Sequence, residues 1–450
     1  MKRVLIANRG EIALRVIRAC RELGLETVAV YSKGDEESLH VALADMAYCI
    51  GPAPAPQSYL NMQNILSVAV GVGVDAIHPG YGFLAENATF AELCASCGIT
   101  FVGPPPGAIE AMGNKDRARK VMAEAKVPIV PGTSGLETAQ DALTAAEEIG
   151  YPVMLKAASG GGGKGMRLVE EPKELARALE MARSEAQRAF GDATVYMEKY
   201  IVKPRHVEIQ VLADNFGNVI HLGERDCSVQ RRHQKLIEEA PCPVLKPETR
   251  AAMGDAAVKA AKAVNYSGAG TVEFLLDALG NFYFMEMNTR IQVEHPVTEL
   301  ITGVDLVKAQ LQVAAGQRLA IKQQDVQFRG WAIECRVNAE DPARNFMPAP
   351  GLIKRWVSPG GPWVRVDGIA YQGYRVVPHY DSMIAKIIVW GHHRAEAISR
   401  MERALGETII EGIPTTIPLH LEVLANQEFR SGDYDTGLLA RMSGQPSDRR

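Results

Sequence analysis

The sequence predicts an α/β protein that starts with a parallel sheet and continues into antiparallel hairpins. Residues 3–7 and 26–31 are apolar runs typical of buried strands, and residues 11–23 between them have a helical apolar period that Gly24 ends. A helix between two buried strands is typical of a parallel sheet. Further along, polar residues recur at every second position over residues 286–294, which is the period of a strand.

Length and composition narrow the possible classes of protein. A chain of 450 residues has room for about three domains. The net charge of -4 and the pI near 6.2 give no support to a nucleic-acid binder. No apolar run approaches the ~20 residues of a membrane span, and the apolar N-terminal segment stops at Asn8, as a first strand would. The seven scattered cysteines suit reduced thiols, so we expect a cytoplasmic protein.

The first strand-to-helix turn resembles a dinucleotide site in position only. It contains Asn8-Arg9-Gly10-Glu11 and lacks the G-x-G-x-x-G pattern, which argues against a dehydrogenase. A later strand enters the glycine-bracketed loop HPGYG at residues 78–82, where Tyr81 could face a ligand or belong to an ordinary turn. We expect a single helix over residues 112–125 to lead out of this first domain.

A glycine loop forms the centre of the second predicted unit. Apolar strands flank the four glycines at residues 160–163, with Lys156 before them and Lys164 after them. This is not a P-loop, because Lys164 is followed by Gly165 and no helix begins there. Such a loop can fold over a nucleotide, since glycine N–H groups can approach phosphate oxygens. The alternative is a flexible hairpin with solvated lysines.

A second hairpin is predicted to hold a divalent ion. Residues 271–277 form a strand that folds back across the turn at Gly280, which sets Glu273 opposite Glu286. Facing carboxylates repel by ~0.2 to 1 kcal/mol at a surface, a cost that Mg²⁺ or Mn²⁺ would remove. Asn288 could supply a third oxygen ligand. The alternative is an acidic hairpin exposed to solvent.

Two further clusters of polar residues lie near this hairpin in the sequence. An extended chain would place the side chains at positions 286, 288, 290, 292 and 294 on one face. Residues 224–235 are rich in cations and amides without helical salt-bridge spacing, which suggests an anion-binding segment. A solvated basic loop is the alternative for that segment.

Taken together, these motifs resemble those of the biotin carboxylases, within the wider ATP-grasp ligases, from residue 1 to about Gly437. The specific motifs are IANRGEI at residues 6–12, HPGYG at 78–82, EKY at 198–200, RHVEIQ at 205–210, QRRHQK at 230–235 and EMNTRIQVEH at 286–295. The resemblance implies an ATP-grasp fold with an N-terminal Rossmann-like domain, a mobile glycine-loop lid and a C-terminal biotin carboxylase domain. The expected boundaries are 1–112 for the N-terminal domain, 113–129 for a helical linker, 130–202 for the lid, 203–330 for the ATP-grasp core and 331–445 for the C-terminal domain.

The resemblance also implies a reaction and its residues. Bicarbonate would attack the γ-phosphate of ATP, and the CO₂ of the resulting carboxyphosphate would be captured by N1′ of biotin. The residues implied for ATP are Lys115, Lys156, Gly161, Gly162, Gly163, Glu198, Lys199, Ile201, His206, Gln230, His233 and Leu275, together with Glu273 and Glu286. Glu273, Glu286 and Asn288 would hold the metal, two Mg²⁺ or Mn²⁺ ions being expected.

The remaining roles concern bicarbonate and biotin. Lys235, Arg290, Gln292, Val293 and Glu294 would bind bicarbonate, with Glu294 as the general base, a role that asks for a raised pKa. The residues implied for biotin are Tyr81, Arg290 and Arg336, of which Arg336 would stabilise an enolate-like oxygen. The catalytic set is therefore Glu294, Arg290, Lys235 and Arg336. The chain departs from the family pattern around its glycines, so Lys164 is given no contact.

The partners follow from a missing motif. The Met-Lys-Met type of hairpin to which biotin is attached does not occur in the sequence, so biotin is expected on a separate carrier protein, with carboxyltransferase subunits as further partners. The resemblance also implies a homodimer, which apolar positions near Trp363 could serve. An acetyl-CoA carboxylase of fatty acid biosynthesis is favoured, while propionyl-CoA, pyruvate and other 2-oxoacids stay open as acceptors. The rival functions are another ATP-grasp ligase, which Arg336 and residues 230–235 argue against, and a nucleotide sensor, which would lack the base or a metal ligand.

Overall fold

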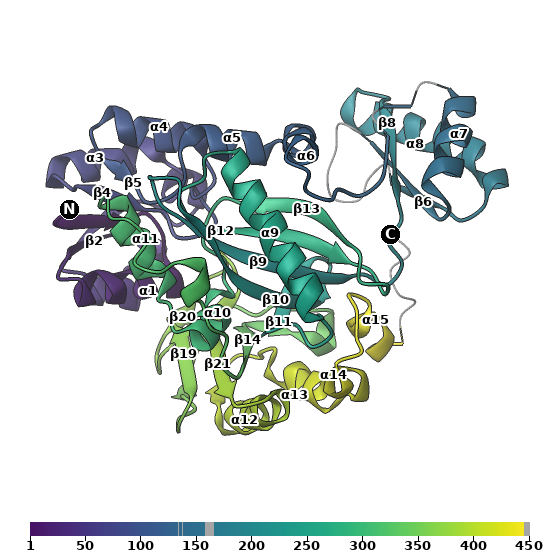
Figure 1. Cartoon of the computed structure of the whole chain (residues 1–450). Helices are drawn as coiled ribbons and strands as arrows, with labels where there is room; N and C mark the ends of the chain where they lie inside the picture. The colour runs from purple at the N-terminus through teal and green to yellow at the C-terminus, as the bar shows by residue number, and fades with distance from the viewer. Residues whose placement is uncertain (134, 137, 158–165, 445–450) are drawn as a thin grey trace.

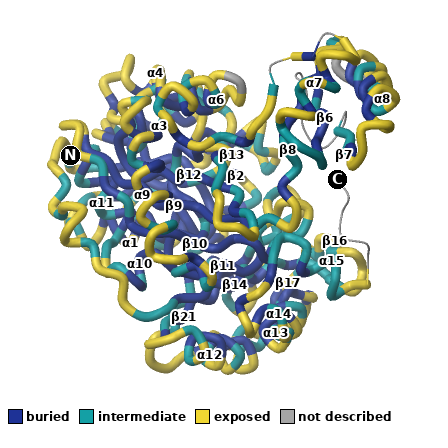
Figure 2. Tube along the Cα trace, turned by 45° about the vertical axis from the view of Figure 1, so that its right-hand side comes forward, coloured by how far each residue is buried: buried dark blue, intermediate teal, exposed yellow. Residues whose placement is uncertain are grey.

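Two sheets organise the chain, a parallel one of five strands and an antiparallel one of eight. The structure is a computed structural model, and it describes residues 1–133, 135–136, 138–157 and 166–444. Figure 1 shows the eight-stranded sheet at the centre, the parallel sheet of the N-terminal region at the left, and a small separate unit beyond α6 at the upper right. The strands of both large sheets are mostly buried (Figure 2).

The parallel sheet confirms the first prediction. Its order is β3-β2-β1-β4-β5, and all of its pairs are parallel. Its strands are β1 (Arg3–Ile6), β2 (Glu26–Ser32), β3 (Met46–Gly51), β4 (Ala76–His78) and β5 (Thr100–Phe101). Its helices are α1 (Gly10–Glu22), α2 (Leu39–Leu43), α3 (Met62–Val72) and α4 (Ala88–Ser96). Gly24 follows α1 with φ of +70°, a conformation that glycine adopts without strain.

The expected single helix over residues 112–125 is wrong. The chain forms α5 (Pro106–Gly113) and α6 (Lys115–Glu124), separated by Asn114 in an extended conformation. The Asn114 side chain accepts a hydrogen bond from the N–H of Arg117 and so caps α6. Asparagine is among the preferred N-cap residues, which explains why a new helix begins there.

A small unit carries the predicted nucleotide lid. Strands β6 (Val153–Ala157), β7 (Arg167–Val169) and β8 (Val195–Lys199) form an antiparallel sheet in the order β7-β6-β8. Helices α7 (Ala139–Ile149) and α8 (Pro172–Phe190) pack on it. The predicted strand, loop and strand order is confirmed for the two strands, while the expected ATP contacts of Gly161, Gly162 and Gly163 lie outside the described residues.

The central sheet has the order β13-β12-β9-β10-β11-β14-β21-β19, and every pair is antiparallel. Its strands are β9 (Arg205–Ala213), β10 (Val219–Arg231), β11 (Gln234–Ala240), β12 (Gly268–Leu276), β13 (Phe282–Asn288), β14 (Trp331–Asn338), β19 (Val364–Gly368) and β21 (Met383–Gly391). Hence residues 205–288 and residues 331–391 share one sheet.

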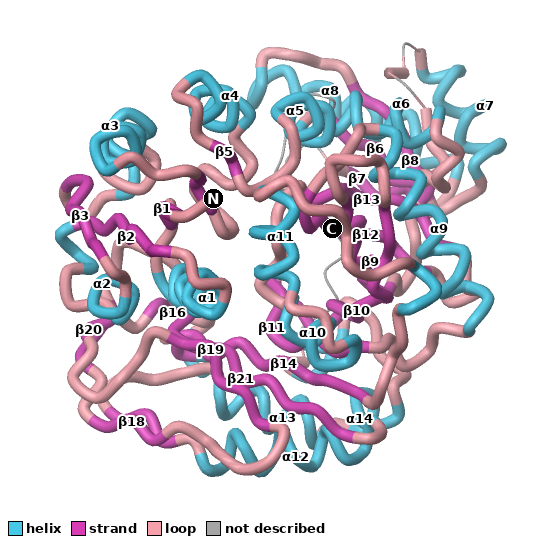
Figure 3. Tube along the Cα trace, turned by 60° about the vertical axis from the view of Figure 1, so that its left-hand side comes forward, coloured by secondary structure: helices cyan, strands magenta, loops and turns pink. Residues whose placement is uncertain are grey.

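The central sheet has an apolar face and a polar face at its β9–β12 end. Val207, Ile209 and Val211 alternate with polar residues along β9 and pack with Met253 of α9 (Pro247–Ala263) in one core. At the other end, the sheet is covered by α10 (His295–Thr302), α12 (Arg394–Glu407) and α1. Figure 3 shows α1 between the parallel sheet and strands β19 and β21, so this helix belongs to both halves of the molecule.

Shorter elements complete the chain. The remaining helices are α11 (Leu306–Ala314), α13 (Ile417–Ala425), α14 (Gln427–Ser431) and α15 (Leu438–Met442). The remaining strands form two-stranded ribbons: β15 (Glu340–Asp341) with β16 (Met347–Pro348), β17 (Gly351–Leu352) with β20 (Arg375–Val376), and β18 (Arg355–Val357) with β22 (Ile409–Glu411). Within the described residues, no helix is both long and apolar enough to span a bilayer.

A buried ion pair of the N-terminal half contacts the C-terminal half through an aromatic ring. Arg9 binds Asp35 through two hydrogen bonds of 2.6 and 2.7 Å, and Tyr59 donates a third to the same carboxylate at 2.7 Å. The Arg9 guanidinium also stacks on the ring of Tyr380, 4.2 Å from its centroid. Burial raises the pKa of Asp35, but Arg9 and Tyr59 outweigh it, so the pKa is lowered.

We expect Asp35→Asn to destabilise the protein by about 3 to 5 kcal/mol at neutral pH, because Arg9 would be left buried without its counter-charge. Since the pKa of Asp35 is lowered in the folded state, its contribution is present above its unfolded pKa and is lost as the pH falls through its folded pKa. Urea unfolding at several pH values measures both effects. Glu26→Gln breaks an exposed pair with Arg3 and should cost less than about 1 kcal/mol; equal losses for both variants would contradict the prediction.

Candidate active site

Charged residues form a row across four neighbouring strands of the central sheet. Arg225 on β10 lies opposite Glu208 on β9, Glu208 lies opposite Glu273 on β12, and Glu273 lies opposite Glu286 on β13. Arg225, Glu208 and Glu273 are buried. Neighbouring carboxylates that lie out of water repel strongly unless cations compensate them. The site is therefore built around three neighbouring carboxylates, Glu208, Glu273 and Glu286, which we call the acidic row, and around the cations that neutralise them.

The predicted pairing of Glu273 with Glu286 is confirmed, although the hairpin is not symmetric. Phe274 pairs with Phe284 and Glu273 pairs with Glu286, so Met285 is an extra residue in β13. A β-bulge of this kind re-aims the residues that follow it, and bulges are common beside active sites. In a regular ladder without the bulge, Met285 would pair with Glu273, and Glu286 would pair with Val272 and face the other side of the sheet.

Lys235 is the cation that the acidic residues share. Its Nζ lies 2.6 Å from Glu208, 2.9 Å from Glu273 and 2.6 Å from Glu294. Arg225 lies beside it and binds Glu208 at 2.5 Å, Gln210 at 2.7 Å and Thr298 at 2.9 Å. Burial raises the pKa of Glu273, but Lys235 and His206 outweigh burial and hold the pKa below its usual range. Lys235 thus keeps this carboxylate ionised.

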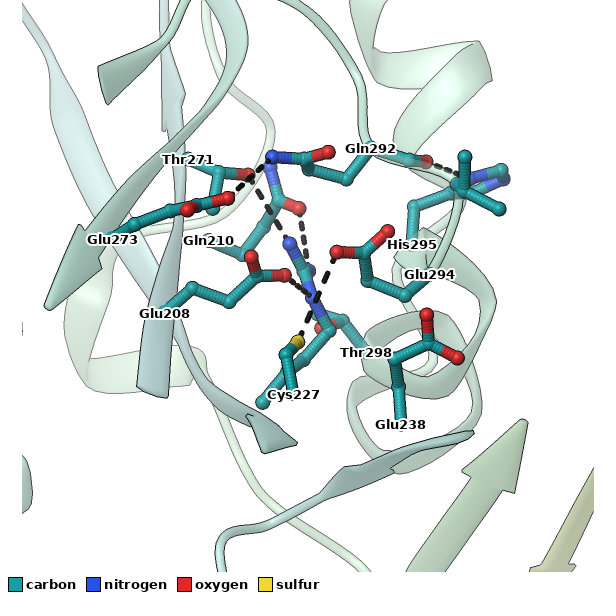
Figure 4. Close-up of polar contacts among 12 residues, drawn as sticks. Glu208, Gln210, Cys227, Glu238, Thr271, Glu273, Gln292, Glu294, His295 and Thr298 are labelled. Atoms are coloured by element: carbon teal, nitrogen blue, oxygen red, sulfur yellow. Dashed lines mark hydrogen bonds and ion pairs between the residues drawn. The ribbon is translucent and has the colours of Figure 1, made fainter. Parts of the chain in front are cut away.

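Glu294 is held between two cations at the centre of the site. It is completely buried, and it binds Lys235 through one oxygen and Arg336 through the other, the latter at 3.0 Å. Figure 4 shows it pointing toward Cys227 and Glu208, with Glu238 nearby. Burial raises the pKa of Glu294, whereas Lys235, Arg336 and Arg225 lower it well below its usual value. The expectation of a raised pKa is therefore wrong, because three cations surround this carboxylate.

Arg336 lies beside a second pair of acids, Glu238 and Glu334. It binds Glu238 on β11 at 2.5 Å, and Glu238 lies opposite Glu334 on β14. Both carboxylates are completely buried. Burial raises the pKa of Glu238 to about 7 and that of Glu334 well above its usual value. Glu238 therefore anchors Arg336, whereas within the described residues neither side-chain oxygen of Glu334 has a hydrogen-bond partner.

The expected polar row over residues 286–294 is wrong as an extended strand. The chain leaves the sheet after Asn288, because the Thr289 N–H donates to the Glu86 side chain and no longer to a neighbouring strand. Glu294 is the N-cap residue of α10. The side chains still converge: Arg290 donates to Glu86 and Asn288, while the remaining contacts are Arg290 to Gln292, Asn288 to Glu273 and Gln292 to Glu273.

The basic segment of residues 224–235 is neither a loop nor wholly solvated. It forms β10, a turn and β11, and the turn residues Arg232 and His233 have φ of +48° and +66°. Two successive positive φ angles are typical of a type I′ hairpin turn. The hairpin directs Lys235 inward, while His233 is exposed at the turn.

A second group of predicted residues lies at the base of the lid. Lys156 binds Glu198 at 2.5 Å, and Arg119 also binds Glu198. Burial, with the nearby charges of Arg119 and Lys115, lowers the pKa of Lys156 to about 8. Lys199 donates to the carbonyls of Gly150 and Tyr151. This concentration of positive charge suits a polyanion.

The other predicted residues lie close to the acidic row. His206 binds Glu273 through Nε2 at 2.8 Å and approaches Gln230 at 3.5 Å, and Leu275 lies opposite His206 in the sheet. Ile201 is buried at the end of the lid. Tyr81 donates to Glu11 of α1, and the carbonyl of Val293 accepts from Lys386.

Sequence reasoning did not select several residues of the site, namely Glu11, Glu86, Glu208, Arg225, Glu238, Glu334 and Lys386. For one of them the signal was present: His206, Glu208 and Gln210 alternate with Val207 and Ile209, which is the period that revealed the hairpin. Arg225 lies in the basic segment of residues 224–235, which the sequence had already indicated, whereas the remaining residues depend on contacts between distant segments, which no local pattern contains.

The oxygen donors of the acidic row suit a hard divalent cation. Glu273 and Glu286 face each other, and the Asn288 side chain lies 2.9 Å from Glu273. A second possible donor set of His206, Glu208 and Glu273 has all three ligand atoms within 4.8 Å of one another. Carboxylate and amide oxygens are preferred by Mg²⁺ and Mn²⁺, so the residues present fit the predicted ion.

Comparisons with known proteins give a consistent result. Residues 1–109 match the biotin carboxylase N-terminal domain, residues 114–322 the ATP-binding domain of the carbamoyl-phosphate synthase L chain, and residues 334–441 the biotin carboxylase C-terminal domain. The chain is 62% identical to biotin carboxylase 1 of Bacillus subtilis, over 98% of both chains. It is 58% identical to a pyruvate carboxylase subunit of Methanothermobacter thermautotrophicus, over 96% of this chain and 88% of that one.

Solved structures agree with these matches. The biotin carboxylase domain dimer of Hydrogenobacter thermophilus 2-oxoglutarate carboxylase, in complex with MgADP, ADP and bicarbonate, has a TM-score of 0.89 at 53% identity over 98% of both chains. A biotin carboxylase complex from Campylobacter jejuni has a TM-score of 0.90 at 50% identity, also over 98% of both chains.

The fold, the acidic row and the lid define an ATP-dependent ligase with the ATP-grasp architecture. The three matched domains and the high identity over nearly the whole length go further. The chain belongs to the biotin carboxylase family. ATP, a magnesium ion and biotin are what an enzyme of this family uses.

We expect Lys235→Met to lower the free energy of unfolding by about 3 to 5 kcal/mol at neutral pH, because three carboxylates would lose the cation they share. The pKa values of Glu273 and Glu294 are lowered in the wild type, so in the variant they should rise and protons should neutralise the cluster as the pH falls. The deficit should therefore shrink toward about pH 5.

Urea unfolding of the wild type and the variant across this pH range tests the expectation. Lys246→Met, at an exposed position, is the control and should change stability by less than about 0.5 kcal/mol. A deficit of the same size at every pH would show that Lys235 acts through packing and not through its charge.

Proposed function

We propose that this protein carboxylates biotin on a separate carrier protein. ATP and bicarbonate would give carboxyphosphate and ADP, and the carboxyl group would pass to N1′ of biotin with release of phosphate. The observation that carries the proposal is the position of Glu294, which is buried between Lys235 and Arg336 beside the acidic row. A base, an anion site and a metal site are thereby contiguous, as this reaction requires.

The nucleotide would lie between the lid and the central sheet. Lys115 and Lys156 carry the positive charge for its phosphates, and Glu273, Glu286 and Asn288 would hold the divalent ions. When bound, such ions neutralise phosphate charge and orient the γ-phosphate. The residues proposed for the rest of ATP are Glu198, Lys199, Ile201, His206, Gln230, His233 and Leu275, with Gly161, Gly162 and Gly163 covering it.

Bicarbonate would bind to Lys235, Arg290, Gln292 and the backbone of Val293. A small planar anion is well oriented by charge-assisted hydrogen bonds from several directions. Glu294 would then take the proton of bicarbonate as it attacks. Its lowered pKa keeps it ionised at neutral pH, and a bicarbonate that shares Lys235 would weaken the attraction that lowers this pKa.

Biotin would bind on the side of Glu294 that faces Arg336, whereas bicarbonate would bind on the side that faces Lys235. Arg336 is held by Glu238 and Glu294 with its guanidinium between them, where it can stabilise negative charge on the biotin oxygen as N1′ loses a proton. Tyr81, in the loop before α4, and Arg290 would complete this part of the site.

We further propose that the protein serves an acetyl-CoA carboxylase of fatty acid biosynthesis in the cytoplasm, with a biotin carboxyl carrier protein and carboxyltransferase subunits as partners. The support is its 62% identity to a protein named biotin carboxylase 1, a name that includes no 2-oxoacid carboxylase. The relatives named for pyruvate and 2-oxoglutarate carboxylases, at 58% and 54%, make a 2-oxoacid carboxylase the second candidate. A homodimer is proposed as well. Trp363 is 58% exposed and its ring packs on that of Trp390, which leaves an apolar surface for a second copy of the chain to cover.

We expect ADP release from ATP and Mg²⁺ to depend on both bicarbonate and biotin, and to fall by at least ~100-fold in Glu294→Gln because the amide cannot accept the proton. Steady-state ADP assays with free biotin, repeated with a biotinylated carrier protein, measure this. Glu422→Gln, at an exposed position of α13, is the control and should keep wild-type rates.

One result would overturn the proposed activity, and a second would overturn only the role of Glu294. ATP binding without any biotin-dependent turnover, even with the carrier, would favour a nucleotide sensor or another ligase. Full activity of Glu294→Gln would leave the carboxylase intact but remove Glu294 from the role of base.

The metal assignment predicts that Glu286→Gln weakens Mn²⁺ binding in the presence of ADP by at least ~10-fold. Glu286 is exposed at the edge of the sheet, but partial desolvation of its carboxyl group and the charge of Glu273 raise its pKa, so in the wild type Mn²⁺ affinity should fall as the pH drops and Glu286 takes up a proton. Electron paramagnetic resonance of free Mn²⁺ gives the dissociation constant. Glu248→Gln, at an exposed position of α9, is the control; the same affinity in both variants would place the ion elsewhere.

A further inference from the structure

Lys386 is a completely buried lysine to which the proposed mechanism gives no role. It lies on β21, between Arg336 on β14 and Asp367 on β19. Burying an ammonium group costs several kcal/mol unless its partners compensate it. Burial lowers the pKa of Lys386, but Glu11, Glu334 and Asp367 outweigh burial and raise it, so the group is charged. A buried charge that is kept at such a cost needs a reason.

The contacts of Lys386 lead directly to the proposed bicarbonate site. Its Nζ donates to the carbonyl of Val293 at 2.6 Å and lies 3.1 Å from Glu11. Glu11 belongs to α1 and also accepts a hydrogen bond from Tyr81. Three segments that are distant in the sequence therefore meet at Lys386, namely α1, the strand β21 and the turn that precedes α10, and Glu11 connects a fourth, the loop of Tyr81. Figure 3 shows α1 beside β19 and β21, in agreement with the ion pair between Glu11 of α1 and Lys386 of β21.

The carbonyl of Val293 is a critical acceptor. Because Glu294 is the N-cap of α10, the Val293 carbonyl precedes the helix and has no place in its hydrogen-bond ladder. That carbonyl and the N–H of Glu294 belong to one rigid peptide plane. A donor that fixes the carbonyl also fixes the orientation of the plane, and with it the start of the Glu294 side chain.

We propose that Lys386 is a positioning residue for the carboxylation reaction: anchored by Glu11, it holds the Val293–Glu294 peptide so that the bicarbonate-binding backbone and the base keep their relative orientation. This inference rests on the proposed function. Glu11 links the same anchor to Tyr81 on the proposed biotin side, so one buried charge pair holds both sides of the site.

Removing Lys386 should impair turnover of bicarbonate more than binding of ATP. We expect Lys386→Met to lower kcat/KM for bicarbonate by roughly 10- to 100-fold while KM for ATP changes by less than about 2-fold, because only the Val293–Glu294 segment loses its support. ADP release at saturating biotin, with either bicarbonate or ATP varied, gives the two values. Lys308→Met, which breaks an exposed pair with Glu22, is the control and should match the wild type in both.

A second variant separates positioning from simple charge balance. In Glu11→Gln/Lys386→Met the unpaired carboxylate is also removed, so the fold should regain stability even where the single variant is unstable. If Lys386 only balances Glu11, this double variant will recover the wild-type kcat/KM for bicarbonate, and the proposal is wrong. If Lys386 holds Val293, thermal stability will return while kcat/KM for bicarbonate stays low.

The wild-type assay keeps the two hypotheses apart. Absence of bicarbonate- and biotin-dependent ADP release in the wild type itself would overturn the proposed function. Wild-type turnover together with an unchanged kcat/KM for bicarbonate in Lys386→Met would overturn only the role of Lys386.

Discussion

The structure of the site depends on the compensation of buried negative charge. Glu208, Glu273 and Glu294 are all buried, and all three share the ammonium group of Lys235. Arg225 and Arg336 extend the compensation to either side. A cluster of this kind stabilises the fold little, because desolvation consumes most of the Coulomb energy. Its value lies in holding charged groups at fixed positions where substrates with opposite or displaceable charge can bind.

The same compensation explains the different pKa shifts of chemically identical groups. The pKa of Glu273 and of Glu294 is lowered because each has cations at close range, whereas the pKa of Glu208 is raised, since burial and the charges of Glu294 and Glu273 outweigh Arg225 and Lys235. With Glu238 and Arg336 included, four carboxylates and three cations form one electrostatic unit. A charge change at one member alters the protonation of the others.

The sequence predicts the parts of this arrangement that are local. The pairing of Glu273 with Glu286 follows from alternation and a glycine turn, and the structure confirms it. The bulge at Met285 could not be predicted, because a symmetric turn gives the same pair. The break after Asn288 was also missed, since Glu86, which captures the Thr289 N–H, lies 203 positions away in the sequence. The metal residues were predicted from the hairpin itself, whereas the ATP and bicarbonate residues came from the family resemblance, and all of these roles stay predictions.

Lys386 shows why the remaining residues of the site could not be predicted without the fold. In the sequence it stands between Ala385 and Ile387 in an apolar strand, where a lysine usually marks the solvent face. Here both faces of that strand are covered, one by the C-terminal core and the other by α1, which reaches across from the parallel sheet. The partner that makes a buried lysine tolerable, Glu11, therefore comes from the first helix of the chain. Because that helix packs on both sheets, the orientation of the Val293–Glu294 peptide depends on the docking of the two halves, and the site is complete only when they are in contact.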